Sequence, residues 1–428
     1  MVSGRGKTFL FLQGPHGPFF YRLSQMLREA GSNVWRIGFN KGDEAFWFDR
    51  KTYIPFTGTA ETWPSAVGEI LTDKRITDVV LYGDTREIHV QAIALAKERG
   101  LRIHVFEEGY LRPYWITYER DGSNGHSRLM SMTVDQMRAA LEGLDLDVPD
   151  APARWGDMRQ HIFYGMAYHF FVLLFNQGYP NFRPHRALSV PKEFLLYLKR
   201  LILLPFTATE RALATTKISS GGFPYHLCLL QLEHDASFQN HSPFSTLGEF
   251  LELVVKGFAD GAPGHHHLVF KAHPLEDGRV PIRQIIRSLA KHHGISKRVH
   301  YVRGGKLARL LNFASSAVTV NSTAAQQVLW RGLPLKAFGD AVYKKRSFTS
   351  SQTLPDFFAN PQRPDGAAYR DYRHYLLETS QVTGGYYASR SRRRLLRQVV
   401  DMMLVIEDPY DALTTGTATP RQQLHVVG

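Results

Sequence analysis

The 428-residue sequence contains a single cysteine, Cys228. One cysteine excludes an intramolecular disulfide and any metal site built from several cysteines, and it is compatible with the cytoplasm. Long apolar runs are also missing, because the longest are Phe170–Phe175 and Phe194–Phe206, whereas a membrane-spanning helix needs about 18–20 uncharged residues. No secretory signal is recognisable at the N-terminus. We therefore expect a soluble or peripheral cytoplasmic protein.

Acidic residues are fewer than basic ones, 39 against 52, and the formal net charge is +13. A basic excess indicates anionic partners and says nothing about the fold. Because no helix-turn-helix, zinc-finger or RNA-recognition pattern accompanies it, we do not expect nucleic acid as a partner. His265–His267 are not expected to bind a metal, since consecutive residues entering a strand point to alternating sides.

What the sequence does contain is an alternation of short apolar strands and amphipathic helices, which occurs twice. The first series of expected strands covers residues 8–13, 33–39, 78–83 and 102–109. The second covers residues 225–231, 267–274, 298–304, 316–322 and 334–339. Helical patterns such as 19–31 and 87–100 lie between strands and end at glycine. This pattern predicts an α/β protein with two doubly wound parallel sheets.

The expected domain boundaries follow from changes in this pattern. Residues 1–215 form an N-terminal lobe that includes an aromatic, proline-interrupted helical insert at about 135–215. Residues 216–345 form a C-terminal lobe, and residues 346–428 form C-terminal helices and a polar tail. Within the last segment, residues 380–408 are expected to form an arginine-rich amphipathic helix. Ligands of such sheets bind beyond the carboxyl ends of the strands, so functional residues are sought there.

In the second lobe, two groups of polar residues follow strands. Lys271 and His273 leave one strand together and supply a positive charge and a hydrogen-bond donor, which suits a phosphate. Asn321, Ser322 and Thr323 lie between a later strand and a helix. Ser322 or Thr323 is expected to cap that helix, whose free N–H groups favour an anion. Both groups also have purely structural explanations, as strand-end turns and helix caps.

A His-Pro pair followed by a Ser/Thr motif recurs in transferases that use CMP-activated acidic sugars. The wider sequence resembles the KpsS type of capsule polysaccharide proteins, which are β-Kdo transferases (Kdo is 3-deoxy-manno-octulosonic acid) with the two-lobed GT-B fold. The matching stretches are residues 11–47, 81–89, 105–125, 230–244, 270–274 and 319–343. One departure is Ala325, which stands where the family pattern leads us to expect glycine.

The resemblance implies a donor, an acceptor and a set of binding residues. The donor is CMP-β-Kdo, no metal or other cofactor is expected, and the acceptor is a (lyso)phosphatidylglycerol at the inner membrane face. Other capsule assembly proteins are expected partners. The residues expected to bind CMP or the donor sugar are Lys271, His273, Pro274, Asn321, Ser322, Thr323, Gln231 and Glu233.

The acidic pair Glu107 and Glu108 ends a first-lobe strand. Because neighbouring strand residues point to opposite faces, only one of them is expected to face the ligand. The resemblance implies retention of anomeric configuration, and by the logic of retaining glycosidases a carboxylate nucleophile accounts for retention. Related enzymes have an acidic residue at the second position, so we assign Glu108. The alternatives are an ion pair with Arg112, or catalysis by Glu107 or Asp84, although Asp84 is also suited to cap a helix.

Two further groups of first-lobe residues are candidates for binding the sugar or the acceptor. Arg86 and Arg112 are suited to hold the carboxylate of Kdo with paired hydrogen bonds. The loop after the first strand lacks the spacing of dinucleotide and P-loop motifs, and in a GT-B enzyme it would line the acceptor side. Its candidate residues are Gln13, Gly14, His16 and Gly17, with a tight structural turn as the alternative.

The aromatic and basic segments of the helical insert are suited either to the membrane interface or to packing against the lobes. The resemblance favours the membrane, and hence a peripheral location on the inner membrane. Two other functions remain open. The first is a transferase with another CMP- or CDP-linked donor, such as a sialic acid or polyol phosphate. The second is a non-catalytic adaptor of capsule assembly or export.

Overall fold

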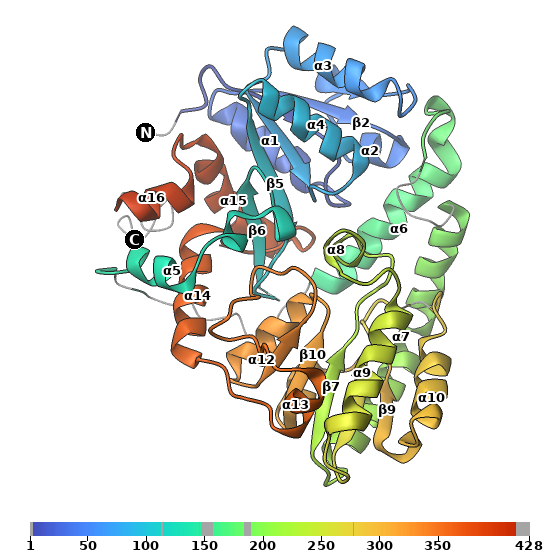
Figure 1. The fold of residues 1–428 in the computed structure, drawn as a ribbon. Helices are drawn as coiled ribbons and strands as arrows, with labels where there is room; N and C mark the ends of the chain where they lie inside the picture. The colour runs from blue at the N-terminus through green and yellow to red at the C-terminus, as the bar shows by residue number, and fades with distance from the viewer. Residues whose placement is uncertain are drawn as a thin grey trace. The chain divides into compact units, whose positions relative to one another are not determined.

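The structure is a computed structural model that describes residues 3–112, 114–144, 146, 157–183, 190–276 and 278–416 (Figure 1). The chain divides into two compact units. The N-terminal unit comprises Met1–Arg128, Arg138–Leu201 and His374–Gly428, and the second unit comprises Leu129–Met137 and Ile202–Arg373. Each unit contains one predominantly or wholly parallel sheet with helices. The predicted α/β fold class with two Rossmann-like sheets is confirmed.

The N-terminal unit has a seven-stranded sheet in the order β12-β6-β5-β4-β1-β2-β3. Strands β1 to β5 run parallel, whereas β6 is antiparallel to both of its neighbours, β5 and β12. The strands are β1 (Thr8–Phe11), β2 (Asn33–Gly38), β3 (Tyr53–Pro55), β4 (Asp78–Tyr82), β5 (Arg102–Glu108), β6 (Trp115–Arg120) and β12 (Gln381–Thr383).

Side chains alternate along β1, so the two faces of this sheet have separate cores. Phe9 and Phe11 lie in one apolar cluster together with residues of α1 and α15, and Leu10 lies in another with residues of α3 and α4. The helices assigned wholly to this unit are α1 (Phe19–Glu29), α2 (Lys41–Ala45), α3 (Trp63–Asp73), α4 (Glu87–Glu98), α6 (Asp157–Phe175), α15 (Ser389–Leu404) and α16 (Pro409–Thr415).

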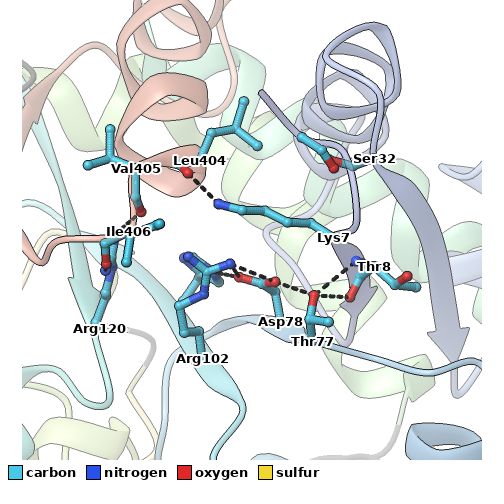
Figure 2. Close-up of polar contacts among 12 residues, drawn as sticks. Lys7, Thr8, Ser32, Thr77, Asp78, Arg102, Arg120, Leu404, Val405 and Ile406 are labelled. Carbon is cyan, nitrogen blue, oxygen red and sulfur yellow. Dashed lines mark hydrogen bonds and ion pairs between the residues drawn. The ribbon is translucent and has the colours of Figure 1, made fainter. Parts of the chain in front are cut away.

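The C-terminal segment is anchored to the N-terminal sheet by backbone carbonyls at the end of α15 (Figure 2). Lys7 donates a hydrogen bond to the carbonyl of Leu404. Arg120, at the end of β6, donates to the carbonyls of Val405 and Ile406 at 2.7 and 2.6 Å. Carbonyls at a helix C-terminus carry partial negative charge, which favours these cationic partners. Figure 1 accordingly shows α15 next to β5 and β6.

The second unit has a five-stranded, fully parallel sheet in the order β11-β10-β7-β8-β9. Its strands are β7 (Tyr225–Leu229), β8 (His267–Lys271), β9 (Val299–Val302), β10 (Ala314–Thr319) and β11 (Leu335–Ala337). Its helices are α8 (Ala236–His241), α9 (Leu247–Gly261), α10 (Ile282–His292), α11 (Leu307–Leu311), α12 (Gln326–Trp330) and α13 (Leu354–Ala359). The division between units falls within three further helices, α5 (Val134–Ala140), α7 (Val190–Ser219) and α14 (Gly366–Thr379).

All nine predicted strands are present, and their ends differ from the expected ones by only a few residues. Strands β3, β6 and β12 and helix α3 were not expected. Residues 380–408 are not one helix, because β12 pairs with β6 before α15 begins at Ser389. The division also differs from the predicted boundaries, since residues 374–428 group with the N-terminal unit. The predicted polar tail at 417–428 and parts of the insert, 147–156 and 184–189, lie outside the described residues.

A histidine cluster lies at the amino ends of β7, β8 and β9. His226 Nε2 lies 2.9 Å from His266 Nδ1, and His267 Nδ1 lies 2.7 Å from His300 Nε2. Each short N···N contact requires one nitrogen to donate and the other to accept, so the two rings of a pair cannot both be protonated. Burial lowers the pKa of His226 to about 3 and that of His300 to about 4.

We expect these histidines to make the second unit acid-sensitive. An unfolded histidine binds its proton near pH 6.5, and the folded chain resists protonation until lower pH. These histidines therefore contribute fully to the free energy of unfolding above pH 6.5, and their contribution decreases as the pH falls toward 4. Urea denaturation at pH 7 and pH 5 should show a lower midpoint at pH 5. His300→Gln should reduce this difference, whereas His292→Gln at the exposed end of α10 should leave it unchanged. Equal midpoints at both pH values would contradict this expectation.

Candidate active site

At the carboxyl ends of β1, β2 and β4, polar side chains form one continuous hydrogen-bonded network. Arg86 donates to Gln13 Oε1 at 3.1 Å, and Gln13 Nε2 donates to Asp43 Oδ2 at 3.1 Å. Asp43 also forms a buried ion pair with Arg36 at 3.2 Å. Because β4, β1 and β2 are neighbours in the sheet, their carboxyl ends meet at one edge. Two predicted residues, Gln13 and Arg86, are thus brought together, and Asp43 joins them.

Helix α6 covers this network with aromatic rings. Asn40 Nδ2 donates to the hydroxyl of Tyr168 at 2.6 Å. The ring of His16 stacks on Tyr168 with centroids 4.1 Å apart and an interplanar angle of 14°. His16 therefore lies in the predicted neighbourhood, packed against a helix that sequence analysis did not connect to this loop.

The glycines of the loop after β1 make room for the chain's own rings. Gly17 has a φ of +115°, and a Cβ atom there would lie 3.0 Å from the ring of Tyr164. A Cβ atom on Gly14 would lie 2.4 Å from the ring of Phe20. Both positions therefore require glycine for packing, whether or not a ligand approaches the backbone.

Glu107 and Glu108 end β5 and point in different directions, as strand alternation predicts. Glu107 Oε1 accepts the N–H of Glu108 at 2.9 Å, and its Oε2 lies 3.4 Å from where a Cβ atom on Gly83 would be. Glu108 Oε1 accepts a hydrogen bond from the hydroxyl of Tyr82 at 3.2 Å. Both residues are partly exposed.

Two tyrosines, the buried Tyr386 and the partly buried Tyr82, support this acidic pair. The hydroxyl of Tyr386 donates to the carbonyl of Glu107 at 2.7 Å, and its ring meets that of Tyr82 edge-on at 5.5 Å. Burial, followed by the negative charge of Glu108, raises the pKa of both tyrosines well above the usual range. Both hydroxyls consequently stay protonated, and Tyr82 remains a donor that orients the Glu108 carboxylate. Sequence analysis missed both tyrosines.

Asp84 does not cap α4, so the structural alternative considered for it is wrong. Its Oδ2 accepts the N–H of Ser123 at 2.8 Å and contacts Nδ1 of His126 at 3.1 Å. Its Oδ1 is buried and accepts no hydrogen bond from the described residues. Arg112 is exposed, and its Nε donates to the carbonyl of Gly109 at 3.2 Å.

In the second unit, two cationic side chains lie together at the carboxyl end of β8. Lys271 is only 7% exposed. Within the described residues its ammonium makes one hydrogen bond, to the carbonyl of Ala272, and this bond is long at 3.5 Å. Arg211 of α7 has a buried Nε atom without a hydrogen-bond partner among those residues. Burial and then the charge of Arg211 lower the pKa of Lys271 to about 8. Buried charge with so little compensation indicates a place for an anion.

His273 follows in the turn after β8. Its Nδ1 accepts the N–H of Leu275 at 3.1 Å. The neutral ring must then carry its proton on Nε2, which makes that nitrogen a donor. Pro274 is exposed and follows His273 directly in the turn. The His-Pro pair thus presents a ring with a defined tautomer beside the cationic strand end.

Ser322 caps the turn after β10, as predicted. Its Oγ accepts the N–H of Ala324 at 3.3 Å at the start of a 3₁₀ turn, Thr323–Ala325. The helix that follows, α12, has only five residues, so its dipole is a weaker attraction for an anion than a long helix provides. Ala325 is fully buried in the place where glycine was expected.

Three other predicted donor-binding side chains bond to the chain itself. Gln231 Nε2 donates to Asn321 Oδ1 at 2.6 Å, and the N–H of Asn321 donates to Gln231 Oε1 at 2.9 Å. These paired amides join the ends of β7 and β10. Glu233 accepts the N–H of Leu247 at 2.7 Å, at the first residue of α9. The three residues therefore position loops at the strand ends.

Within the described residues, no group of three or more histidine, cysteine, aspartate or glutamate side chains is placed to hold a metal ion. No helix in that part of the chain combines the length and the apolar character needed to cross a bilayer.

Comparison with protein families gives a match over residues 77–387 to a model described as "Capsule polysaccharide biosynthesis protein". The capsule polysaccharide export protein KpsS of Escherichia coli is 30% identical over 383 residues, which cover 89% of this chain and 97% of KpsS. The capsule polysaccharide modification protein LipB of Neisseria meningitidis is 31% identical over 396 residues, covering 89% of this chain and 92% of LipB.

Among solved structures, the Thermosulfurimonas dismutans KpsC, a β-Kdo 2,7 transferase, matches with a TM-score of 0.42 and 12% identity. The match covers 93% of this chain and all of that one.

Proposed function

The chain belongs to the family of capsule polysaccharide biosynthesis proteins, and from this premise we propose that it is a retaining β-Kdo transferase. It would move Kdo from CMP-β-Kdo to a (lyso)phosphatidylglycerol and so start the poly-Kdo linker of a capsular polysaccharide. It would work in the cytoplasm, on the inner face of the membrane and beside other capsule assembly proteins. The proposal assigns no metal or other cofactor to the reaction.

The observation that carries the proposal is the cationic site at the end of β8. Lys271 is a buried cation with one long hydrogen bond within the described residues, Arg211 has a buried Nε atom without a partner among them, and His273 carries an Nε2–H donor in the turn that follows. A nucleotide phosphate would compensate both charges and accept this donor. Ser322 and Thr323, at the capped turn after β10, which is separated from β8 by β7, would complete the phosphate site. Stabilising the departing CMP is the electrostatic contribution of this unit to catalysis.

The N-terminal unit would supply the nucleophile. In the first step an oxygen of Glu108 bonds to the anomeric carbon, the bond from that carbon to the phosphate breaks, and CMP leaves with the electron pair. In the second step a glycerol hydroxyl oxygen attacks the same carbon, the bond to Glu108 breaks, and the hydroxyl proton passes to water. Two inversions give net retention. Tyr82 would hold one oxygen of Glu108 and leave the other for attack.

The remaining candidates would bind the sugar and the acceptor. Arg86, fixed by its hydrogen bond to Gln13, would hold the carboxylate of Kdo, and the exposed Arg112 could approach the same group. The His16–Tyr168 stack would form a platform for the acceptor. On α6, Phe170 and Leu174 are 42% and 47% exposed, which supports contact of the helical insert with the membrane interface.

Lys271 gives CMP binding a predicted pH dependence. A bound phosphate favours the charged ammonium, and the pKa of Lys271 in the free protein is lowered to about 8. Affinity for CMP should therefore decrease as the pH rises above 8. Calorimetric titration with CMP between pH 6 and 9.5 measures this change. Lys271→Arg, which stays charged throughout that range, should remove it, and an unchanged pH profile in this variant would assign the dependence to another group.

The donor itself is tested by incubating the protein with CMP-Kdo, CMP-sialic acid and CDP-linked polyols, each with phosphatidylglycerol, and measuring nucleotide release. The proposal predicts release from CMP-Kdo only. Release from another donor identifies the alternative transferase. No release from any donor, together with no CMP binding, identifies a non-catalytic adaptor.

A further inference from the structure

Helix α15 has one buried face and one strongly cationic face. Leu395, Leu396, Val399, Val400 and Met403 of this helix are buried against the N-terminal unit. Arginines at positions i, i+3, i+4 and i+7 are all exposed and lie on one side of the helix. We refer to them as the arginine stripe: Arg390, Arg393, Arg394 and Arg397.

Among the described residues, the arginine stripe has no acidic partner in an ion pair. The helix contains no acidic residue before Asp401. Like charges three and four positions apart repel each other on a helix. Arg392, which is not part of the stripe, instead donates to the carbonyl of Tyr387 at 2.9 Å and fixes the turn before α15. An anionic partner that covers the stripe would relieve this repulsion.

The stripe begins next to the candidate nucleophile. Tyr386, three residues before α15, donates to the carbonyl of Glu107, and its ring meets that of Tyr82, the donor to Glu108. Glu108 and α15 therefore belong to the same side of the N-terminal sheet. A partner bound along the stripe would lie close to the place where the acceptor must arrive.

Helix α6 lies next to the start of the stripe and carries an exposed aromatic side chain. Tyr387, two residues before α15, stacks on His161 of α6, with ring centroids 4.5 Å apart. Phe163 of α6 is 59% exposed, and because it is two positions from His161 it points to a different side of that helix. A lipid interface accommodates both kinds of side chain, because cations meet its phosphates and aromatic rings enter its headgroup layer.

We propose that the arginine stripe of α15 is a docking surface for an anionic phospholipid bilayer. The stripe holds the N-terminal unit on the membrane so that a lipid headgroup reaches Glu108. The inference rests on the proposed function only in taking the acceptor to be a lipid, because vesicle binding itself requires no catalysis.

The test measures how much of the full-length chain sediments with lipid vesicles. One set of vesicles contains phosphatidylglycerol mixed with phosphatidylcholine, and the other contains phosphatidylcholine alone. The wild-type protein should bind the mixed vesicles at low salt and dissociate in high salt. Replacing Arg390, Arg393 and Arg397 by glutamine should weaken partition about 100-fold, because each basic residue near the surface contributes a factor of roughly five. The matched control replaces Arg283, Arg287 and Lys291, an exposed basic row on α10, by glutamine, and it should bind as the wild type does.

Three results would overturn the inference: equal loss of binding in the control triple variant, equal binding of the wild type to phosphatidylcholine alone, and unchanged binding of the stripe variant. A transfer assay separates this inference from the proposed function. The stripe variant should lose transfer to vesicle-embedded acceptor and keep transfer to a water-soluble short-chain analogue. If the wild type transfers nothing in either format but binds vesicles through the stripe, the proposed function fails and the docking surface stands.

Discussion

Glu108→Gln is expected to reduce Kdo transfer by about 10³-fold or more, because the amide cannot form the glycosyl-enzyme. The change is nearly isosteric, so Tyr82, which donates to Glu108 at 3.2 Å, keeps a hydrogen-bond acceptor and the fold is preserved. Initial rates of CMP release and of lipid glycosylation measure the loss. Because the phosphate site lies in other residues, affinity for CMP should change little.

Glu107→Gln is the matched control, since it removes the neighbouring carboxylate and leaves Glu108 in place. Its Oε1 accepts the N–H of Glu108, which an amide oxygen can still accept, so transfer should fall far less than in Glu108→Gln. A reversed order of the two variants would assign the nucleophile to Glu107. Near wild-type transfer by both would remove this acidic pair from the mechanism.

His273→Ala is expected to lower transfer by about 10²- to 10³-fold, the usual cost of removing one hydrogen-bond donor from a developing negative charge. The structural reason is the ring's tautomer: Nδ1 accepts the N–H of Leu275, so the neutral ring carries its donor proton on Nε2. His273→Gln retains a donor and should recover part of the activity. Rates at saturating CMP-Kdo, together with the midpoint of thermal unfolding, separate loss of catalysis from loss of folding.

A suitable control is His292→Ala, at the exposed end of α10, which should leave transfer unchanged. If His273→Ala transfers Kdo at the wild-type rate while remaining folded, the phosphate is not bound at the end of β8. Another anion would then be needed to explain the burial of Lys271 and of the Nε atom of Arg211.

The strands could be predicted because parallel strands buried on both faces leave continuous apolar runs such as those of β1, β4 and β8. Strand β6 was missed because it returns antiparallel from β5 through a short connection, without the helix that marks a parallel crossover. Strand β12 was missed because only three residues form it, and its partner β6 is more than 260 positions away.

Part of the candidate site could be predicted from the sequence. The predictable part consists of the strand ends, because polar residues there follow directly on apolar runs. Gln13 and Arg86 lie together because neighbouring parallel strands bring their carboxyl ends to one edge. Local sequence could not show that Gln231 and Asn321 bond to each other, since two amides at strand ends are equally suited to a ligand. It also could not connect Tyr386 with Glu107, or Arg211 with Lys271, because each contact depends on long-range folding.

The most direct test of the central proposal is mass and linkage analysis of the product formed from CMP-Kdo and a fluorescent phosphatidylglycerol analogue. The proposal predicts that the analogue gains one or more Kdo residues, the first joined to glycerol by a β-linkage, and that CMP is released in equal amount. An unmodified analogue in the presence of folded protein and intact CMP-Kdo would contradict the proposed activity. An α-linked product would contradict retention and the role of Glu108 as the nucleophile.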